Sequence, residues 1–412
     1  MPFIIIWAII ISTVHAGSFM MHDRVCANPV KMDNIVVVCN DINFSSANDE
    51  YAVYMYEVNQ DLQIRRTTTL DIADVFVEKA MKINATEILL IAETQSKCVE
   101  VLTLNVHNMQ LHTVVTHCAT SALSLEDEYH PHTLLFDDGS LLFSMEREGV
   151  QSATVELLYL QDLKHQRYAT VSFPEYKDYV IFKMMPYKEG AVVMLRSQKH
   201  ATDTVLLRLH KNKQGSFDTS VLYETHTQTV ASFDIDDATI FLYGNEVSQK
   251  QMSLFLYAID AKGVLHRYLD AFPMAFQPVG LTISKTLFLT GVLTNTRKKP
   301  FELGLLDIAI DHGKARVSYE RLDRHSISGC SAPILVEGDD YMSLFFNHAR
   351  QVVRIDPVKA QVKEKILLPV SHVLLIPNSP RFLKFSHKMF LTYTAIEGNT
   401  IKNIIQEVGK QQ

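Results

Sequence analysis

Short apolar runs recur along this chain, and each ends in one aliphatic residue followed by one polar residue. A few polar residues come next and a second apolar run begins, which is the pattern of two strands joined by a tight turn. The clearest copy has apolar residues 256–259, the turn Asp260-Ala261-Lys262-Gly263 and a returning run from residue 264. The aliphatic–polar pairs lie 45 to 56 residues apart: Val58-Asn59, Leu104-Asn105, Leu160-Gln161, Leu209-His210, Ile259-Asp260, Ile310-Asp311 and Ile355-Asp356. Such a period predicts repeated structural units.

Most of these units hold a second hairpin. In the third unit, strands are expected at residues 132–136, 141–145, 155–160 and 167–173, and Asp137-Asp138-Gly139 turns the chain between the first two. An Asp-Gly pair between apolar runs is a strong hairpin signal. The fifth and sixth units follow the same order. Four short strands in every unit of about 50 residues predict the blade of a β-propeller.

The number of blades stays open between seven and eight. After the seventh hairpin, residues 371–408 hold four more apolar runs, which form either an eighth blade or strands that close the ring against the first. Residues 72–83 fit a helix as well as a strand. We therefore expect an all-β fold, a β-propeller of seven or eight four-stranded antiparallel blades. Residues 17–412 are assigned to this single domain.

Residues 1–16 differ from the rest of the chain. Residues 3–14 are almost wholly apolar, and Val14-His15-Ala16 places small residues at the two positions that a signal peptidase reads. This run is too short for a membrane anchor, which needs about 20 apolar residues. We expect a secretory signal peptide that is cleaved before Gly17, and hence a secreted, extracellular protein. A buried first strand is the alternative.

The positions of the cysteines fit an oxidising compartment. Cys98 opens the first strand of the second unit's hairpin and Cys118 closes its returning strand, so the two are equidistant from the turn and face each other. Cys26 and Cys39 flank a turn in the same way. We predict the disulfides Cys26–Cys39 and Cys98–Cys118, which leaves Cys330 unpaired. Five scattered buried thiols are the alternative.

Charge and glycosylation motifs add little to this picture. The net charge of −7 and the pI near 6.2 argue against a nucleic-acid partner. No segment after the leader is long and apolar enough to span a membrane. The sequons that begin at Asn43 and Asn84 predict N-glycosylation and support secretion.

The loops between blade strands are the first candidate site. In a blade lettered A to D from the centre outward, the B–C loops and the links between blades emerge on one face of the ring, termed the loop face. The C–D turns emerge on the other, termed the turn face. Nearly every expected B–C loop carries a cation, which predicts a ring that attracts an anionic ligand; ordinary solvated charge is the alternative. These cations are Lys97, Arg147, Lys199, Lys250, Arg297, Lys298, Lys299 and Arg350.

His130 and His132 form the second candidate site, in the link between the second and third units. On an extended backbone the two imidazoles project to one side, and the carboxylates at 126–128 can complete a metal site. A solvated acidic link is the alternative. Motifs for nucleophilic, zinc or phosphate chemistry, such as Gly-x-Ser-x-Gly and His-Glu-x-x-His, do not occur in the sequence. No cofactor is predicted.

Because a fold does not dictate function, three functions stay open. We favour a secreted binding module, a monomer that presents one loop face to an extracellular protein or a polyanionic ligand. The first alternative is a secreted, metal-assisted propeller hydrolase that uses carboxylates or histidines in the central channel. The second is a structural or scaffold protein.

Overall fold

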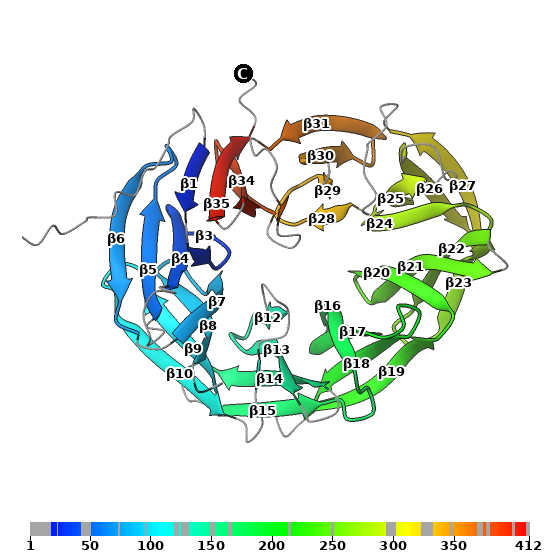
Figure 1. The fold of residues 1–412 in the computed structure, drawn as a ribbon. Helices are drawn as coiled ribbons and strands as arrows, with labels where there is room; N and C mark the ends of the chain where they lie inside the picture. The colour runs from blue at the N-terminus through cyan, green and yellow to red at the C-terminus, as the bar shows by residue number, and fades with distance from the viewer. Residues whose placement is uncertain are drawn as a thin grey trace, which may run out of the picture.

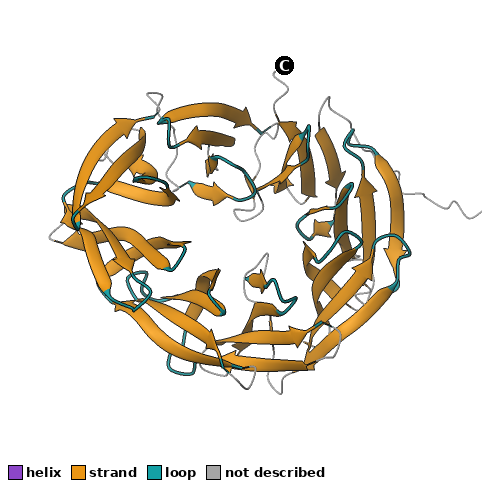
Figure 2. Ribbon diagram, turned by 180° about the vertical axis from the view of Figure 1, so that it is seen from behind, coloured by secondary structure: helices purple, strands orange, loops and turns teal. Residues whose placement is uncertain are grey.

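Eight small antiparallel sheets stand around a central axis, each with one edge strand toward the centre (Figure 1). The computed structural model describes residues 18–22, 24–42, 51–72, 75–94, 96, 98–118, 123–124, 132–148, 153–163, 167–212, 216–248, 251–293, 302–322, 333–346, 349–368, 374–375, 380–397 and 400–408. Within these residues the chain forms strands and turns and no helix (Figure 2). The protein is therefore an all-β propeller of eight blades, the larger of the two numbers that the sequence left open.

The blades follow one another along the chain, and each runs from an inner strand at the centre to an outer strand at the rim. The first four blades contain β2 (Val25–Cys26), β3 (Val30–Lys31), β4 (Ile35–Ile42), β5 (Tyr51–Val58) and β6 (Ile64–Leu70); β7 (Val75–Lys82), β8 (Glu87–Thr94), β9 (Cys98–Asn105) and β10 (Leu111–Cys118); β11 (Leu123–Ser124), β12 (Thr133–Leu135), β13 (Leu141–Glu148), β14 (Ala153–Asp162) and β15 (Arg167–Ser172); and β16 (Tyr179–Tyr187), β17 (Gly190–Ser197), β18 (Thr204–Lys211) and β19 (Phe217–Thr225).

The second half of the ring repeats this order. Blades 5 to 8 contain β20 (Gln228–Asp236), β21 (Thr239–Ser248), β22 (Gln251–Ile259) and β23 (Leu265–Phe272); β24 (Phe276–Ile283), β25 (Leu287–Leu293), β26 (Glu302–Asp311) and β27 (Lys314–Arg321); β28 (Ile334–Val336), β29 (Met342–Phe346), β30 (Gln351–Asp356) and β31 (Gln361–Leu367); and β32 (Leu374–Leu375), β33 (Arg381–Lys384), β34 (Met389–Glu397), β35 (Thr400–Val408) and β1 (Ser18–His22). In blades 1, 3 and 8 the inner strand is split into two short pieces that pair with the same second strand.

Blade 8 closes the ring with strands from both ends of the described chain. β1 is its outer strand and pairs antiparallel with β35, from Ser18 opposite Gln406 to His22 opposite Lys402. Residues 374–408 supply the other strands of the same sheet. Both alternatives that the sequence left open for residues 371–408 are therefore true. The strands of this segment form an eighth blade, and that blade joins the C-terminal part of the domain to its first strand.

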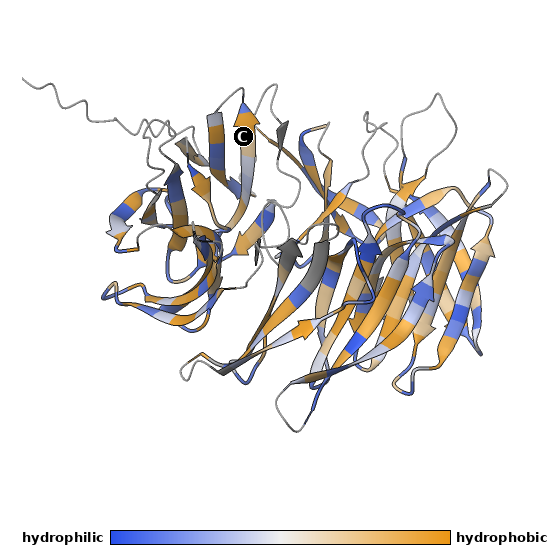
Figure 3. Ribbon diagram, turned by 60° about the horizontal axis from the view of Figure 1, so that its bottom comes forward, coloured by the Kyte–Doolittle hydropathy of each residue, from blue (hydrophilic) through white to orange (hydrophobic). Residues whose placement is uncertain are grey.

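The core is a ring of hydrophobic clusters, one at each seam between neighbouring blades. A sheet that is covered on both faces needs apolar side chains on both faces, so its strands read as continuous apolar runs. β8 and β17 show this pattern, with five and six consecutive buried residues. Figure 3 shows hydrophobic, orange segments along many of the strands. The seams hold the ring together and fix where neighbouring turns meet.

In several of the repeated pairs the polar residue stabilises the C–D turn through hydrogen bonds to the backbone. Asp260 Oδ1 accepts hydrogen bonds from the backbone N–H groups of Lys262 and Val264, each at 2.9 Å. Asn59 makes two equivalent bonds inside its own turn. Short side chains that bond their own backbone favour turns, which explains why Asn and Asp recur here. Of the seven preceding aliphatic residues, six are fully buried at their seams and only Ile310 is partly exposed.

Both predicted disulfides are present. Cys26 is bonded to Cys39, and Cys98 is bonded to Cys118. The two cysteines of each pair lie directly opposite one another in adjacent strands, as their equal distances from a turn predict. The pairings are confirmed. Cys330 lies outside the described residues.

Polar side chains on second strands hold the inner strand of the next blade. Asn40 on β4 makes two hydrogen bonds with the backbone of Val77 in blade 2, donating at 2.9 Å and accepting at 2.8 Å. Asn245 on β21 donates to the Phe276 carbonyl oxygen in blade 6 at 2.7 Å. Because these buried amides are satisfied only in one relative position of the blades, they fix the register across the seam.

β7 is a strand, so the helical alternative for residues 72–83 is wrong. Its buried residues are Val75, Val77 and Ala80, so the two-residue spacing of a strand is interrupted after Val77. The interruption arises because a bulge between Val77 and Lys79 shifts the alternation of the strand by one residue. The pattern was ambiguous for this physical reason.

Candidate binding site

Most of the cations that the sequence analysis assigned to the loop face lie outside the described residues: Lys97, Lys250, Arg297, Lys298 and Lys299. Arg147 belongs to β13 rather than to a loop, and its backbone pairs with Leu123 and Thr154. Its side chain is not among those described. The predicted ring of cations stays a prediction.

Two of these cations have described side chains. Lys199, in the B–C loop of blade 4, places its Nζ atom 2.5 Å from Asp178 Oδ2 in the preceding link. Arg350 lies half-buried before β30 in blade 7, and its carbonyl oxygen accepts a hydrogen bond from Leu368 at 2.9 Å. The structure therefore does not bring these two cations together, and the positive charge of Lys199 is offset by a neighbouring carboxylate.

Of the predicted metal ligands, His132 is described and His130 is not. Burial, and then the positive charge of Lys79 on β7, lower the pKa of His132 to about 4. Its imidazole is therefore neutral at pH 7, as a metal ligand must be. The positive charge of Lys79, however, would repel a metal cation bound beside it. Among the described residues no three His, Cys, Asp or Glu side chains gather as a metal site. The metal site at His130 and His132 stays a prediction.

A groove of about 470 Å³ opens between blades 3 and 4 on the turn face. Because successive strands alternate in direction, the A–B turns emerge beside the C–D turns on this face. The groove is bordered by the A–B turn of blade 3 at 136–140, the A–B turn of blade 4 at 186–189, and the outer hairpin of blade 4 at Lys211 and Phe217. Its position is set by the seam between two blades.

The floor of the groove is aromatic. The rings of Tyr159 on β14 and Phe217 on β19 meet edge to face, with centroids 4.8 Å apart. Tyr159 is fully buried and Phe217 is 8% exposed. The half-buried side chains of Leu135 and Phe136 and the exposed Pro186 complete the apolar lining. Because the two rings are buried, a ligand would contact mainly Leu135, Phe136 and Pro186, and well-packed apolar contacts near the centre of an interface contribute most to binding energy.

An ion pair joins the two blades inside the groove. Lys211 Nζ lies 3.0 Å from Asp138 Oδ2 and 5.3 Å from the centroid of the Tyr159 ring. The Tyr159 hydroxyl, and after it the Asp138 carboxylate, raise the pKa of Lys211. Hydrogen bonds from the hydroxyl and then the backbone N–H of Ser140, together with Lys211, lower the pKa of Asp138. Both groups therefore keep their charges at neutral pH.

The other charged groups lie exposed at the mouth of the groove. Asp137 and Glu189 make no ion pair with any described residue. Lys188 lies with its Nζ atom 5.1 Å from the centroid of the Tyr187 ring. The lining thus contains three carboxylates, those of Asp137, Asp138 and Glu189, and two ammonium groups, a net charge of −1. The rim is acidic after the Lys211–Asp138 pair is set aside.

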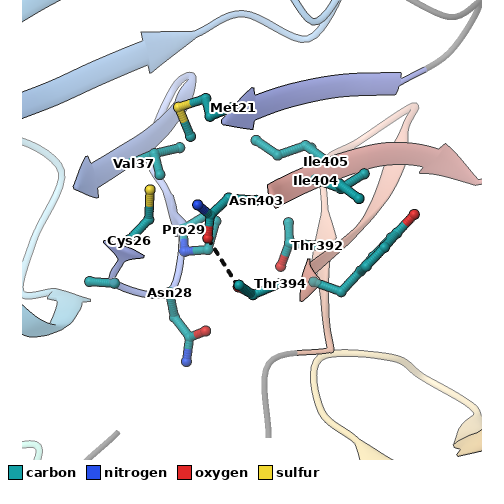
Figure 4. Close-up of a pocket in the computed structure, with 12 residues that line it drawn as sticks. Met21, Cys26, Asn28, Pro29, Val37, Thr392, Thr394, Asn403, Ile404 and Ile405 are labelled. Atoms are coloured by element: carbon teal, nitrogen blue, oxygen red, sulfur yellow. Dashed lines mark hydrogen bonds between the residues drawn. The ribbon is translucent and has the colours of Figure 1, made fainter. Parts of the chain in front are cut away.

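A much smaller cavity of about 10 Å³ lies at the closing seam between blades 8 and 1 (Figure 4). Asn403 of β35 donates a hydrogen bond to the Arg24 carbonyl oxygen at 2.7 Å and accepts one from Thr394 at 3.0 Å, the bond drawn in Figure 4. A single water molecule needs about this much space. We interpret this cavity as a packing feature of ring closure and not as a ligand site.

Comparison with known proteins identifies the fold. Neither a protein-family model nor a curated protein matches the sequence. Among solved structures, Sqt1 of Saccharomyces cerevisiae is 11% identical, with 95% of this chain and 98% of that chain covered and a TM-score of 0.53. Dipeptidyl peptidase 4 of Porphyromonas gingivalis is 12% identical, with 87% and 56% covered and a TM-score of 0.50. The WD40 domain of SCAP from fission yeast is 10% identical, with 94% and 98% covered and a TM-score of 0.42.

Similarity at these identities establishes a propeller fold and nothing finer. The chain spans only 53% to 58% of the length of the first five matching structures, all of them peptidases or related hydrolases. Their activities are properties of those proteins and are not carried over to this chain.

Sequence reasoning missed the groove. It identified Asp137-Asp138-Gly139 only as a turn, because a turn is the commonest role of such residues. Nothing in the sequence connects Asp138 with Lys211, which lies 73 residues further along the chain. The available signal was weak: Tyr159 and Phe217 place aromatic rings near the outer hairpins of two consecutive units.

Proposed function

We propose that this protein is a secreted binding module, in which a rigid eight-bladed ring presents one face to an extracellular protein. The observation that carries the proposal is the groove between blades 3 and 4. It combines a buried aromatic floor with an exposed, charged rim. An apolar centre within a polar rim is the usual composition of a protein interface. The proposal places the binding surface on the turn face rather than on the loop face.

Several features support secretion as part of this proposal. The two disulfides are compatible with an oxidising compartment. Asn84 is exposed in the A–B turn of blade 2, where its Oδ1 atom accepts a hydrogen bond from Thr86 N–H at 2.8 Å. A glycan on Asn84 would extend from the turn face. The leader at residues 1–16 and the sequon at Asn43 lie outside the described residues. Among the described residues no helix is suited to cross a membrane.

Expression of the full chain in eukaryotic secretory cells tests the location. We expect a mature N-terminus at Gly17 in the medium, both disulfides in a non-reducing peptide map, and a glycan on Asn84 that is lost in Asn84→Gln. Retention of residues 1–16 on an intracellular product would contradict secretion.

A binding screen of the secreted chain tests the function. Labelled protein is applied to cell surfaces and to extracellular polyanions at low and physiological salt, because binding to polyanions weakens steeply with salt. The Arg297→Ala/Lys298→Ala/Lys299→Ala variant reports on the loop face. If this variant retains saturable binding to cells, the result supports a partner on the turn face. The hydrolase alternative would replace the proposal if the chain bound no surface but hydrolysed members of a peptide or ester panel, and if a chelator abolished that hydrolysis.

A further inference from the structure

We propose that the groove binds a linear segment of a protein partner that inserts one large apolar side chain next to a lysine or arginine. This inference rests on the proposed function and specifies its ligand. The apolar lining of the groove indicates that the segment carries a large apolar side chain. The half-buried Leu135 and Phe136 and the exposed Pro186 present apolar surface, which is backed by the buried rings of Tyr159 and Phe217. A groove of about 470 Å³ lies within the range of sites that enclose a ligand group of this size.

The charges at the rim of the groove indicate that the segment also carries a basic side chain. Lys211 and Asp138 already satisfy one another at 3.0 Å. Two carboxylates at the mouth, Asp137 and Glu189, face a single remaining ammonium, that of Lys188. A cation from the partner would meet an excess of negative charge at the rim while its neighbour fills the floor. Charge complementarity of this kind contributes mainly to specificity and to the rate of association.

The distribution of polar groups favours a protein segment over an isolated small molecule. In a small-molecule site, polar groups converge inside the cavity to orient the ligand. Here the exposed charges of Asp137, Lys188 and Glu189 stand at the mouth, and the buried floor is aromatic. The chain as a whole carries a net charge of −7, and residues 1–16 contain no Lys, Arg, Asp or Glu, so cleavage would leave this charge unchanged. A basic partner would thus also be attracted at long range.

The composition of the chain gives a direct assay. Trp7 is the only tryptophan, so residues 17–412 contain none. A tryptophan peptide therefore reports its own binding through its fluorescence when excited at a wavelength that tyrosine does not absorb. The probes are two capped tetrapeptides of sequence Gly-Trp-Lys-Gly and Gly-Trp-Glu-Gly. They present the same large ring beside opposite charges.

The secreted chain is titrated with each peptide. We expect saturable binding of the Trp-Lys peptide, at least about fivefold tighter than that of the Trp-Glu peptide, since exposed charge pairs contribute up to about that factor each. Asp137→Lys/Glu189→Lys should abolish or reverse this preference. Phe136→Ala should weaken both peptides and leave their ratio unchanged. Thermal unfolding of each variant confirms that it is folded.

The matched control is Asp71→Lys/Glu175→Lys. It changes the net charge by the same amount at two exposed acids in links on the loop face, and it should keep the preference for Trp-Lys. Equal affinities for the two peptides would overturn the proposal. So would the absence of a saturable fluorescence change up to about 5 mM peptide, a concentration at which the free energy of binding becomes too small to matter. If the groove variants still bind cell surfaces as the wild type does, the groove assignment fails while the binding module stands. If none of the proteins, including the wild type, binds cell surfaces, the proposed function itself is contradicted.

Discussion

The seam between blades 3 and 4 and the seam between blades 4 and 5 share one topology but differ in the polar contacts that cross them; the groove described above lies at the first. At the second, the Tyr187 hydroxyl donates a hydrogen bond at 2.9 Å to the carbonyl oxygen of Ala238 in the neighbouring A–B turn. Phe136 occupies the corresponding position in blade 3, as the last residue before its A–B turn. It has no hydroxyl to bridge the two turns. One hydroxyl group thus joins the A–B turns of blades 4 and 5, and the corresponding position in blade 3 lacks it.

The inner part of the seam between blades 4 and 5 is also tied more tightly. Lys183 Nζ contacts Ser232 Oγ at 3.1 Å, the Phe233 carbonyl oxygen at 2.5 Å and Asp234 Oδ1 at 2.9 Å. Tyr243 then donates to Asp234 Oδ2 at 2.9 Å. At the seam between blades 3 and 4, the Lys211–Asp138 pair is the corresponding charged link, and it is more exposed. Repeated blades therefore give similar packing, while the polar contacts that cross each seam differ.

The largest expected effect concerns the backbone beside the groove. A Cβ atom on Gly190, at the start of β17, would lie 2.0 Å from the Leu209 carbonyl oxygen. Gly190→Ala should therefore lower the free energy of unfolding by about 3 kcal/mol. Gly139, in the turn of blade 3, has φ +80° and open space around its Cβ position. Gly139→Ala should cost only about 1 kcal/mol, as backbone strain. Urea unfolding measures both; equal losses would mean that space is not what Gly190 provides.

Removing the charged link at each seam tests whether the two seams differ in strength. Lys183→Met leaves the partly buried Asp234 without its cation, and we expect a loss of about 2 kcal/mol in unfolding free energy. Lys211→Met breaks a more exposed pair and should cost less than about 1 kcal/mol. The midpoint of urea unfolding gives the comparison. A larger loss for Lys211→Met would reverse the ranking of the seams.

The pH dependence of stability tests the central end of the seam between blades 3 and 4. The folded-state pKa of His132 is about 4, below its ordinary value of 6.5. The unfolded chain therefore takes up the proton first, so the stability from this residue is full above pH 6.5 and is lost as the pH falls from 6.5 toward 4. We expect the wild type to lose about 2 kcal/mol more than His132→Gln between pH 7 and pH 4. Parallel pH profiles would show that His132 is not held neutral.

The smallest effect tests the hydroxyl that distinguishes the two junctions. Tyr187→Phe should lower the unfolding free energy by about 1 kcal/mol, because the Ala238 carbonyl oxygen loses its partner. Phe136→Tyr adds a hydroxyl at the groove and should change stability by less than about 0.5 kcal/mol. If Tyr187→Phe is also neutral, the hydrogen bond between the two turns does not stabilise the seam between blades 4 and 5.

The sequence predicted features that depend on local spacing. The period of the aliphatic–polar pairs predicted the blades, and equal distances from a turn predicted Cys26–Cys39 and Cys98–Cys118. The particular contacts that join distant residues could not be predicted. Closure of the ring by residues 371–408 was one of two alternatives, but nothing local marks the pairing of β1 with β35. The groove depends in the same way on Asp138 and Lys211 meeting across a seam. The bulge in β7 shows a third limit, since one extra residue interrupted the alternation that marks a strand.

The most direct test of the proposed binding surface is a flow-cytometry titration of cells with the labelled, secreted chain. Three proteins are compared: the wild type, Asp137→Lys/Glu189→Lys in the groove, and Asp71→Lys/Glu175→Lys on the loop face. We predict that the groove variant loses at least about 80% of the saturable signal at a concentration where wild-type binding is half-maximal, as a tenfold weakening would produce. The loop-face variant should bind as the wild type does. Wild-type binding by the groove variant, with loss in the loop-face variant, would contradict the assignment of the partner to the turn face.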